Sequence, residues 1–469
     1  MSAERQTRLF AIIVAAMAGL CALALFHVAQ VVPLHIPLDP NEGWNAYHAD
    51  AAVQAGVLYP RAPSMMVNNY PPLFFFLDGA LGEDIGDTIV AGRILSLIAF
   101  VAIACEIALI STRAGAFPLE AAFSVLFFAA ALLLYSNYVG MSDPQLVGHA
   151  LQLPAAVILL KSQRSVAAIA CAAFLLVLAF FFKHNLIVLP LALAIWLALE
   201  DRRSAPKFAA LGLAFLLIGL GAFRLVFGTG LLEQLQSARQ YSFAFLLSGF
   251  VPWLAWNSAP SIAAIPVLAS AWRESFARCC GIYLVMAVIT GAMFYGGAGV
   301  DSNAMFDAVI ALSLVSGFAL ARFRAPVRRL LIASAWALPL AIKFFAFFDA
   351  QWLTADYWAR PMKEERQSAT SDIAFLRSNS GAALCQMLSL CYWADKPAEA
   401  DVFNLGQQYA TGKRSDADLV ALLSGKYFAV IQIDPDGTMA LTPRIKAVFD
   451  ASYRLDHANE NDGAFYVRR

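Results

Sequence analysis

Residues 9–32 read LFAIIVAAMAGLCALALFHVAQVV, an unbroken apolar run that follows the basic start MSAERQTR. A helix needs about 20 apolar residues to cross the hydrocarbon of a bilayer, and this run is long enough. It also exceeds the roughly 7 to 15 apolar residues of a secretory signal core. We therefore expect a retained first membrane span at the start of the chain.

Apolar blocks of similar length recur along the chain as far as Phe348. Of the 469 residues, 60% are hydrophobic and 14% are charged, whereas a soluble domain has about 25% charged residues. The formal net charge of +0 excludes a generally basic nucleic-acid-binding protein. The sequence predicts an α-helical polytopic membrane protein with about 11 transmembrane helices, near residues 9–31, 88–110, 119–136, 146–161, 165–182, 185–200, 207–227, 257–272, 278–297, 303–322 and 328–348.

Basic residues concentrate in the short connections on one side of the predicted bundle. These are the segments MSAERQTR, STRAG, KSQRS, EDRRSAPK, WRESFAR and RFRAPVRR, whereas the opposite loops carry acids and few bases. Positively charged loops stay in the cytoplasm. We therefore expect a multi-pass protein of the inner (cytoplasmic) membrane, with a cytoplasmic N-terminus and an extracytoplasmic C-terminal part.

The predicted outer side also holds two long connections, at about 32–88 and 227–256. In the first, Asn41 is placed to cap a helix on which Trp44, Tyr47 and His48 share one face. We expect that helix to lie at the membrane surface with its aromatic side chains at the headgroup level.

The polarity of the sequence becomes mixed beyond residue 349. Short β-rich runs, AALCQMLSL, KYFAVIQI and GAFYVRR, alternate with helical or turn-like stretches. We therefore divide the chain into a transmembrane domain at 1–349 and a soluble α/β domain at 350–469. Cys385 and Cys391 could pair if that domain lies outside the cytoplasm. The sequence alone does not show whether their geometry permits a bond.

Candidate catalytic residues follow the first span directly. Asp39 and Glu42 are carboxylates placed near the membrane surface, where one could accept a proton from an acceptor hydroxyl or hold a cation beside a phosphate. The structural alternative is a helix cap with an acid in the first turn. Asp143, in the next outer loop, is a third acid that could meet them at the same membrane face.

Candidate phosphate-binding residues lie in two other outer segments. Lys183 and His184 form the turn between the fifth and sixth predicted spans, and positive charge is otherwise scarce on this side. A snorkelling helix anchor is the alternative for Lys183. Arg239 is a weaker candidate, since a solvated helix face is the simpler explanation of it. Tyr70 either contacts a sugar or belongs to the aromatic belt, and Arg93 is placed to pair with an acid of the first loop.

Taken together, these features resemble the GT-C superfamily of membrane glycosyltransferases, which includes protein mannosyltransferases and the aminoarabinose transferase of lipid A. The resemblance rests on DPNEGWNAYHA at 39–49, YPPLFFF at 70–76, SDPQ at 142–145, KHN at 183–185 and DSNAMFD at 301–307. It implies a polyprenyl-phosphate sugar as donor and a glycan, lipid or protein as acceptor. Many members carry adjacent Asp-Glu in the first loop, whereas here Asn41 precedes Glu42, which leaves the identity of the base open.

The resemblance also implies roles for individual residues. The catalytic or metal-associated carboxylate corresponds to Asp39 or Glu42, and Asp143 is a second acidic position. Donor-phosphate contacts are expected from Lys183, with His184 and Arg239 beside it. The substrate cavity is expected to include Trp44, Tyr47, Tyr70, Asp301 and Asn303. Some members use a divalent metal cation, and the spacing of acids in this sequence does not decide that point.

Two other functions compete with a transferase. A transporter or flippase of a lipid-linked or anionic solute would commonly show an inverted repeat or matching broken spans, and neither is visible in the sequence. A non-catalytic scaffold with the same fold is the second alternative, since a fold does not guarantee an activity.

Overall fold

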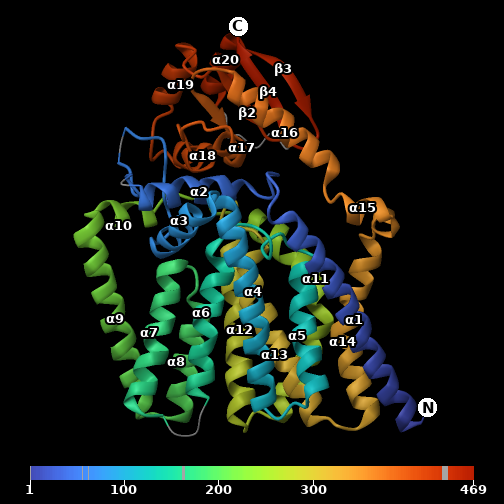
Figure 1. Ribbon diagram of the computed structural model, residues 1–469. Helices are drawn as coiled ribbons and strands as arrows, with labels where there is room; N and C mark the ends of the chain where they lie inside the picture. Colours follow the sequence, from blue (N-terminus) through green and yellow to red (C-terminus); the bar gives the residue numbers. More distant parts are fainter. Residues whose placement is uncertain (1, 55, 62, 161–163, 436–441) are drawn as a thin grey trace.

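The computed structural model describes residues 2–469, except 55, 62, 161–163 and 436–441. The basic segment at 161–165 therefore lies partly outside the described residues. A bundle of long helices carries a smaller domain at one end, and the N-terminus lies at the other end (Figure 1). The other basic connections lie at the end that holds the N-terminus, as the charge pattern predicted (Figure 1).

The long apolar helices coincide with the predicted spans. Among the described residues, six helices are long and apolar enough to cross a membrane, and others are shorter but equally apolar. The count of 11 spans stays a prediction, while the chain as a whole is built as a multi-pass membrane protein. The helices of the bundle are α1 (Ala3–Val31), α4 (Thr88–Arg113), α5 (Pro118–Leu133), α6 (Pro144–Leu159), α7 (Val166–Phe182), α8 (Val188–Glu200), α9 (Ser204–Phe227), α11 (Phe243–Ser270), α12 (Ser275–Tyr295), α13 (Phe306–Arg322) and α14 (Pro326–Ala346).

The second long outer connection is shorter than predicted. The short helix α10 (Gly230–Leu235) occupies part of it, and α11 begins at Phe243 instead of near residue 257. Ser242 starts α11 because its hydroxyl accepts a hydrogen bond from the backbone N–H of Phe245 at 3.0 Å. The apolar residues that follow then continue as helix into the expected span.

The first outer connection folds into two helices, α2 (Pro40–Val53) and α3 (Leu73–Ile85), between the bundle and the C-terminal domain (Figure 1). The predicted placement of the α2 aromatics at the headgroup level is wrong. The indole of Trp44 donates to Asp401 at 2.9 Å, and the hydroxyl of Tyr47 donates to the carbonyl of Lys396 at 2.6 Å. These polar tips are satisfied by the C-terminal domain, which covers this face.

The C-terminal domain is a mixed four-stranded sheet with helices around it. The strand order is β1-β2-β4-β3, with β1 parallel to β2 and the other neighbours antiparallel. The predicted run at 382–390 is a strand only at its start, since helix α17 begins at Leu388. The elements are η2 (Ala350–Leu353), α15 (Ala355–Ala359), α16 (Lys363–Ser378), β1 (Ala383–Cys385), α17 (Leu388–Trp393), α18 (Val402–Ala410), α19 (Ala417–Ser424), β2 (Val430–Ile433), α20 (Pro443–Ser452), β3 (Tyr453–Asn459) and β4 (Gly463–Arg468).

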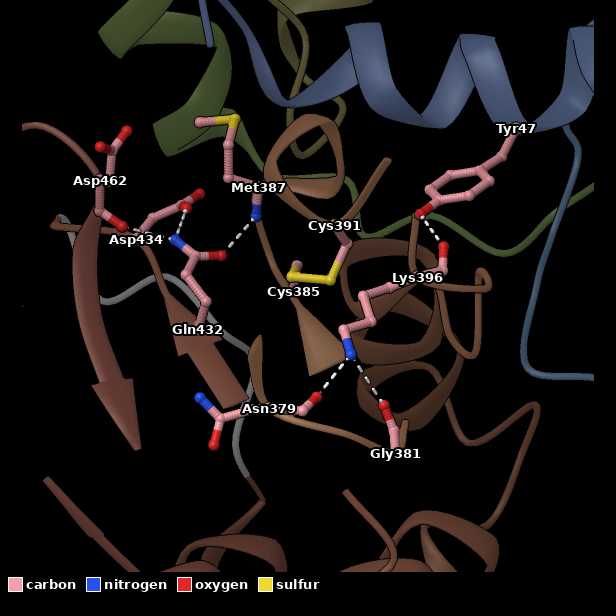
Figure 2. The surroundings of a disulfide bond; sticks show 10 residues. All are labelled: Tyr47, Asn379, Gly381, Cys385, Met387, Cys391, Lys396, Gln432, Asp434 and Asp462. Carbon is pink, nitrogen blue, oxygen red and sulfur yellow. Dashed lines mark hydrogen bonds between the residues drawn. A yellow bond between two sulfur atoms is a disulfide. The ribbon is translucent and has the colours of Figure 1, made fainter. Parts of the chain in front are cut away.

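A disulfide joins Cys385 at the end of β1 to Cys391 in α17 (Figure 2). Helix α17 packs directly on α2, and the contact is close because α2 has Gly43 there. A Cβ atom at Gly43 would lie 2.1 Å from the backbone nitrogen of Ser389. The disulfide therefore constrains the part of the C-terminal domain that touches the first outer loop.

Candidate active site

Asp39, and not Asn41, caps helix α2. The Asp39 Oδ1 accepts a hydrogen bond from the backbone N–H of Asn41 at 2.8 Å, and Pro40 occupies the first helical position. Proline fits there because its missing N–H has no partner to lose within the helix. The predicted cap was two residues too late, since Pro40 fixes the helix start before Asn41.

Glu42 is fully buried and every side of its carboxylate is occupied. Arg93 binds it in a bidentate manner, with Nε to Oε1 at 2.7 Å and NH2 to Oε2 at 2.7 Å. The backbone N–H groups of Leu38 and Ser142 add bonds of 3.1 and 3.0 Å. The predicted pairing of Arg93 with an acid of the first loop is confirmed. A carboxylate held in this way has no free position for a substrate proton.

Arg93 also binds the backbone just before Asp39. Its guanidinium donates to the carbonyl groups of Leu34 at 2.7 Å and Ile36 at 2.6 Å. One buried arginine therefore fixes the path of the chain between the first span and α2. The Glu42–Arg93 pair serves to build the site.

Asp39 differs from Glu42 in exposure and in partners. It is half-buried, and among the described residues its Oδ2 has no hydrogen-bond partner. Burial and, to a smaller extent, the negative charges of Glu42, Asp143 and Asp301 outweigh the bond from Asn41 and raise the pKa of Asp39 to about 7. A carboxylate that titrates near neutral pH is suited to take up a proton and to release it again.

Asp143 forms a second buried ion pair, with Lys183. The Lys183 Nζ lies 3.3 and 3.1 Å from the two carboxylate oxygens, and both side chains are almost fully buried. The same Nζ lies 3.8 Å from the centre of the Tyr70 ring. Burial alone would lower the pKa of Lys183, but the Asp143 carboxylate and Tyr70 outweigh it and the pKa is raised. Lys183 is therefore a fixed cation.

Three elements hold the Asp143 loop in place. The Asp143 Oδ1 caps α6 by accepting from the N–H of Gln145 at 2.7 Å. The amide of Asn45, on α2, donates to the carbonyl of Ser142 at 2.8 Å, and the hydroxyl of Ser96, on α4, donates to the Asp143 carbonyl at 3.3 Å. The first and second outer loops are thus locked together around the acids.

A cavity of about 280 Å³ borders this cluster, and we call it the Lys183 pocket. It gathers residues that lie far apart in the sequence, including three of those predicted to bind phosphate and two of those predicted to line a substrate cavity. The lining residues are Asn69, Tyr70, Lys183, His184, Asn185, Leu235, Ser237, Arg239, Tyr241, Phe294, Gly297, Gly299, Val300, Asn303 and Ala304.

The basic residues of the Lys183 pocket have different charges. The guanidinium of Arg239 donates to the carbonyl of Ala298 at 2.8 Å and lies over the ring of Phe403 at 5.4 Å. Burial lowers the pKa of His184 to about 4, helped by the charges of Lys183 and Arg239. His184 is therefore neutral at pH 7 and can form a hydrogen bond with a ligand in the pocket.

Other predicted cavity residues lie outside the lining of the Lys183 pocket. Trp44 and Tyr47 face the C-terminal domain, although the Trp44 ring lies 4.9 Å from that of Tyr70 and supports it. Asp301 is exposed, close to the lining residue Val300.

Sequence reasoning missed two groups near the site. Tyr138 is buried, and its pKa is raised well above the usual range by burial and by the charges of Asp143, Asp301 and Asp39. Gln145, His149 and Gln152 form a buried polar row on α6. Their i, i+4, i+7 spacing within an apolar helix was the available signal, because such a row shares one face.

Two of the three candidate acids are already paired with cations. Glu42 is neutralised by Arg93 and Asp143 by Lys183, and among the described residues no group of three or more His, Cys, Asp or Glu side chains is arranged to hold a metal ion.

The chain shares its fold with solved structures of ArnT. The chain superimposes on ArnT from Cupriavidus metallidurans bound to undecaprenyl phosphate with a TM-score of 0.61, at 14% sequence identity over 97% of each chain. The apo state of the same protein gives a TM-score of 0.62 at 12% identity, again over 97% of each chain. No protein-family model and no curated protein sequence matches the chain.

Proposed function

We propose that the protein is a glycosyltransferase that moves a sugar from a polyprenyl-phosphate donor to an acceptor hydroxyl at the outer face of the inner membrane. The observation that carries the proposal is the separation of roles among three acids. The Glu42 carboxylate is fully occupied by Arg93 and backbone N–H groups, and Asp143 is paired with Lys183. Asp39 has an oxygen without a partner among the described residues and a pKa raised to about 7.

Asp39 is the proposed general base. The acceptor oxygen attacks the anomeric carbon of the donor sugar, and its proton passes to the Asp39 carboxylate. The bond from that carbon to the phosphate oxygen breaks, and the electron pair stays with the phosphate. Attack opposite to the leaving group inverts the anomeric configuration.

Lys183 and Arg239 are the proposed partners of the donor phosphate. Cations fixed at a leaving phosphate stabilise the charge that develops there, so no second acid is needed to protonate it. Asp143 and Tyr70, which contact Lys183, keep its ammonium charged and in place. That the similar ArnT structure contains undecaprenyl phosphate supports a polyprenyl-phosphate donor.

The proposed orientation places the C-terminal domain outside the cytoplasm. The charge asymmetry of the loops supports it, and so does the disulfide between Cys385 and Cys391, because disulfides persist in oxidising compartments. Lipid of the membrane surrounds the bundle, and the acceptor is a glycan, a lipid or a protein of the cell envelope.

The test is a transfer assay with purified protein in lipid vesicles and radiolabelled polyprenyl-phosphate sugars. We expect turnover by the wild type and a loss of about 10² to 10⁴-fold in Asp39→Asn, the range of general-base catalysis. Asp50→Asn, on the same helix and outside the site, is the matched control and should stay active. The proposal fails if the wild type consumes no donor, and it fails in its choice of base if Asp39→Asn turns over normally. Donor movement between leaflets without chemistry would instead support a flippase.

A further inference from the structure

The Lys183 pocket rests on a chain of buried polar side chains. The Gln145 Oε1 lies 3.4 Å from Nδ2 of both Asn185 and Asn303, two lining residues. The Gln145 Nε2 lies 3.1 Å from the Nε2 of His149. His149 is fully buried in α6, so each of its ring nitrogens needs a partner there.

The hydrogen-bond pattern sets the direction of every amide in this chain. Because the Gln145 oxygen receives two N–H donors, its own NH2 group faces His149, whose Nε2 must then accept. The ring proton of His149 is consequently on Nδ1, which faces the amide of Gln152 at 2.8 Å. In the structure the Gln152 Nε2 faces this Nδ1 and the Gln152 Oε1 is buried without a partner, so turning the amide by about 180° would satisfy both groups.

The consequence appears at the pocket wall. Asn185 and Asn303 each donate a side-chain N–H to Gln145, so their side-chain oxygens can accept a hydrogen bond from a ligand. The Asn185 Oδ1 and the His184 Nδ1 are both buried without a hydrogen-bond partner among the described residues. Unpartnered buried polar atoms are costly unless something binds them. Hydroxyl groups of a sugar would supply the missing donors.

The charge of the pocket points to the class of sugar. Lys183 and Arg239 line it as cations, and no Asp or Glu is found among its lining residues in the described part of the chain. Asp143 is already paired with Lys183, Asp301 is exposed outside the lining, and Asp39, the proposed base, also lies outside the lining. A phosphate fits this field, whereas an ammonium group would meet two like charges.

We propose that the Lys183 pocket selects a neutral, hydroxyl-bearing sugar and discriminates against one that carries a charged amine. The proposal rests on the proposed glycosyltransferase activity and names the donor class of that same site. The side-chain oxygens of Asn185 and Asn303 accept hydrogen bonds from sugar hydroxyl groups. Lys183 and Arg239, which bind the phosphate, repel an ammonium group.

The test compares three donors on one polyprenyl phosphate: a pentose, its amino-deoxy analogue, and that analogue with the amine formylated. We expect the pentose and the formylated sugar to be consumed at least about tenfold faster than the free amine. Faster use of the free amine overturns the inference and leaves the glycosyltransferase proposal standing. If no donor is consumed, the proposed function fails and the inference falls with it.

A pair of variants separates charge from shape. Ser237 lines the pocket, so Ser237→Asp adds a negative charge and Ser237→Asn adds a similar volume without charge. We expect Ser237→Asp to raise the rate ratio of the free amine to the pentose at least about threefold, and Ser237→Asn to leave it unchanged. Equal ratios in both variants would overturn the electrostatic argument.

His149→Leu should raise the KM for the pentose donor with little change in kcat, because the residue only orients the wall.

Discussion

The Glu42–Arg93 and Asp143–Lys183 pairs are both buried ion pairs beside the same outer loops, yet they are built differently. In the first, bidentate bonds and backbone partners fill every position of the carboxylate. In the second, the lysine also borders an open cavity and an aromatic ring. A saturated pair organises the chain, whereas a pair with one accessible member is available to a ligand. The two pairs are therefore expected to respond differently to substitution.

The largest effect is expected from breaking the saturated pair. Arg93→Met leaves Glu42 buried without its partner, which costs about 3 to 5 kcal/mol of folding free energy. Thermal unfolding in detergent should show the loss as a lower Tm or as aggregation. The double variant Glu42→Gln with Arg93→Met removes both charges and should regain much of the stability. A stable but inactive Arg93→Met would mean that the pair belongs to the catalytic machinery.

Breaking the accessible pair should act on activity more than on folding. Lys183→Met removes a cation that faces the proposed donor phosphate, and we expect kcat/KM for donor to fall about 10²-fold. The double variant Asp143→Asn with Lys183→Met should restore stability without restoring activity. If the double variant recovers turnover, the Lys183 charge serves the fold alone, and the contrast between the two pairs is lost.

Much of this architecture could be predicted from the sequence, because membrane spans and loop charge are local properties. The helices α1, α4 and α12 lie where the apolar blocks placed them. The pairing of Arg93 was also predictable, since a charge inside a span must find a partner. The early start of α11 was not, because its Ser242 cap lies in a stretch that also reads as a loop.

The different roles of the acids could not be predicted from the sequence. Asp39 and Glu42 are three residues apart and equally acidic, and only their contacts distinguish a base from an anchor. Strand β3 was missed because it is an exposed edge strand with the polar residues Arg454, Asp456 and His457. The aromatics of α2 were placed in the wrong surroundings because their partners, Asp401 and Lys396, come from the far end of the chain.

The pH dependence of turnover sharpens the comparison from the side of Asp39. A general base works deprotonated, and the pKa of Asp39 is raised to about 7. We therefore expect kcat/KM to rise about tenfold per pH unit below that value and to level off above it. His184, with its pKa near 4, adds no limb in this range. A flat profile between about pH 5.5 and 8 would contradict Asp39 as the titrating base.

The smallest effect on turnover is expected from removing the disulfide, which lies outside the lining of the Lys183 pocket. Cys385 and Cys391 hold α17 against Gly43, on the Glu42 side of α2, and neither residue lines the Lys183 pocket. A bond across so short a loop contributes about 2 kcal/mol, chiefly by restricting the unfolded chain. Replacing both cysteines with alanine should therefore lower the Tm measured in detergent while donor turnover changes less than about twofold. A selective loss of turnover at unchanged Tm would show instead that the position of α17 affects Asp39 through α2. The disulfide would then contribute to the arrangement of the proposed active site.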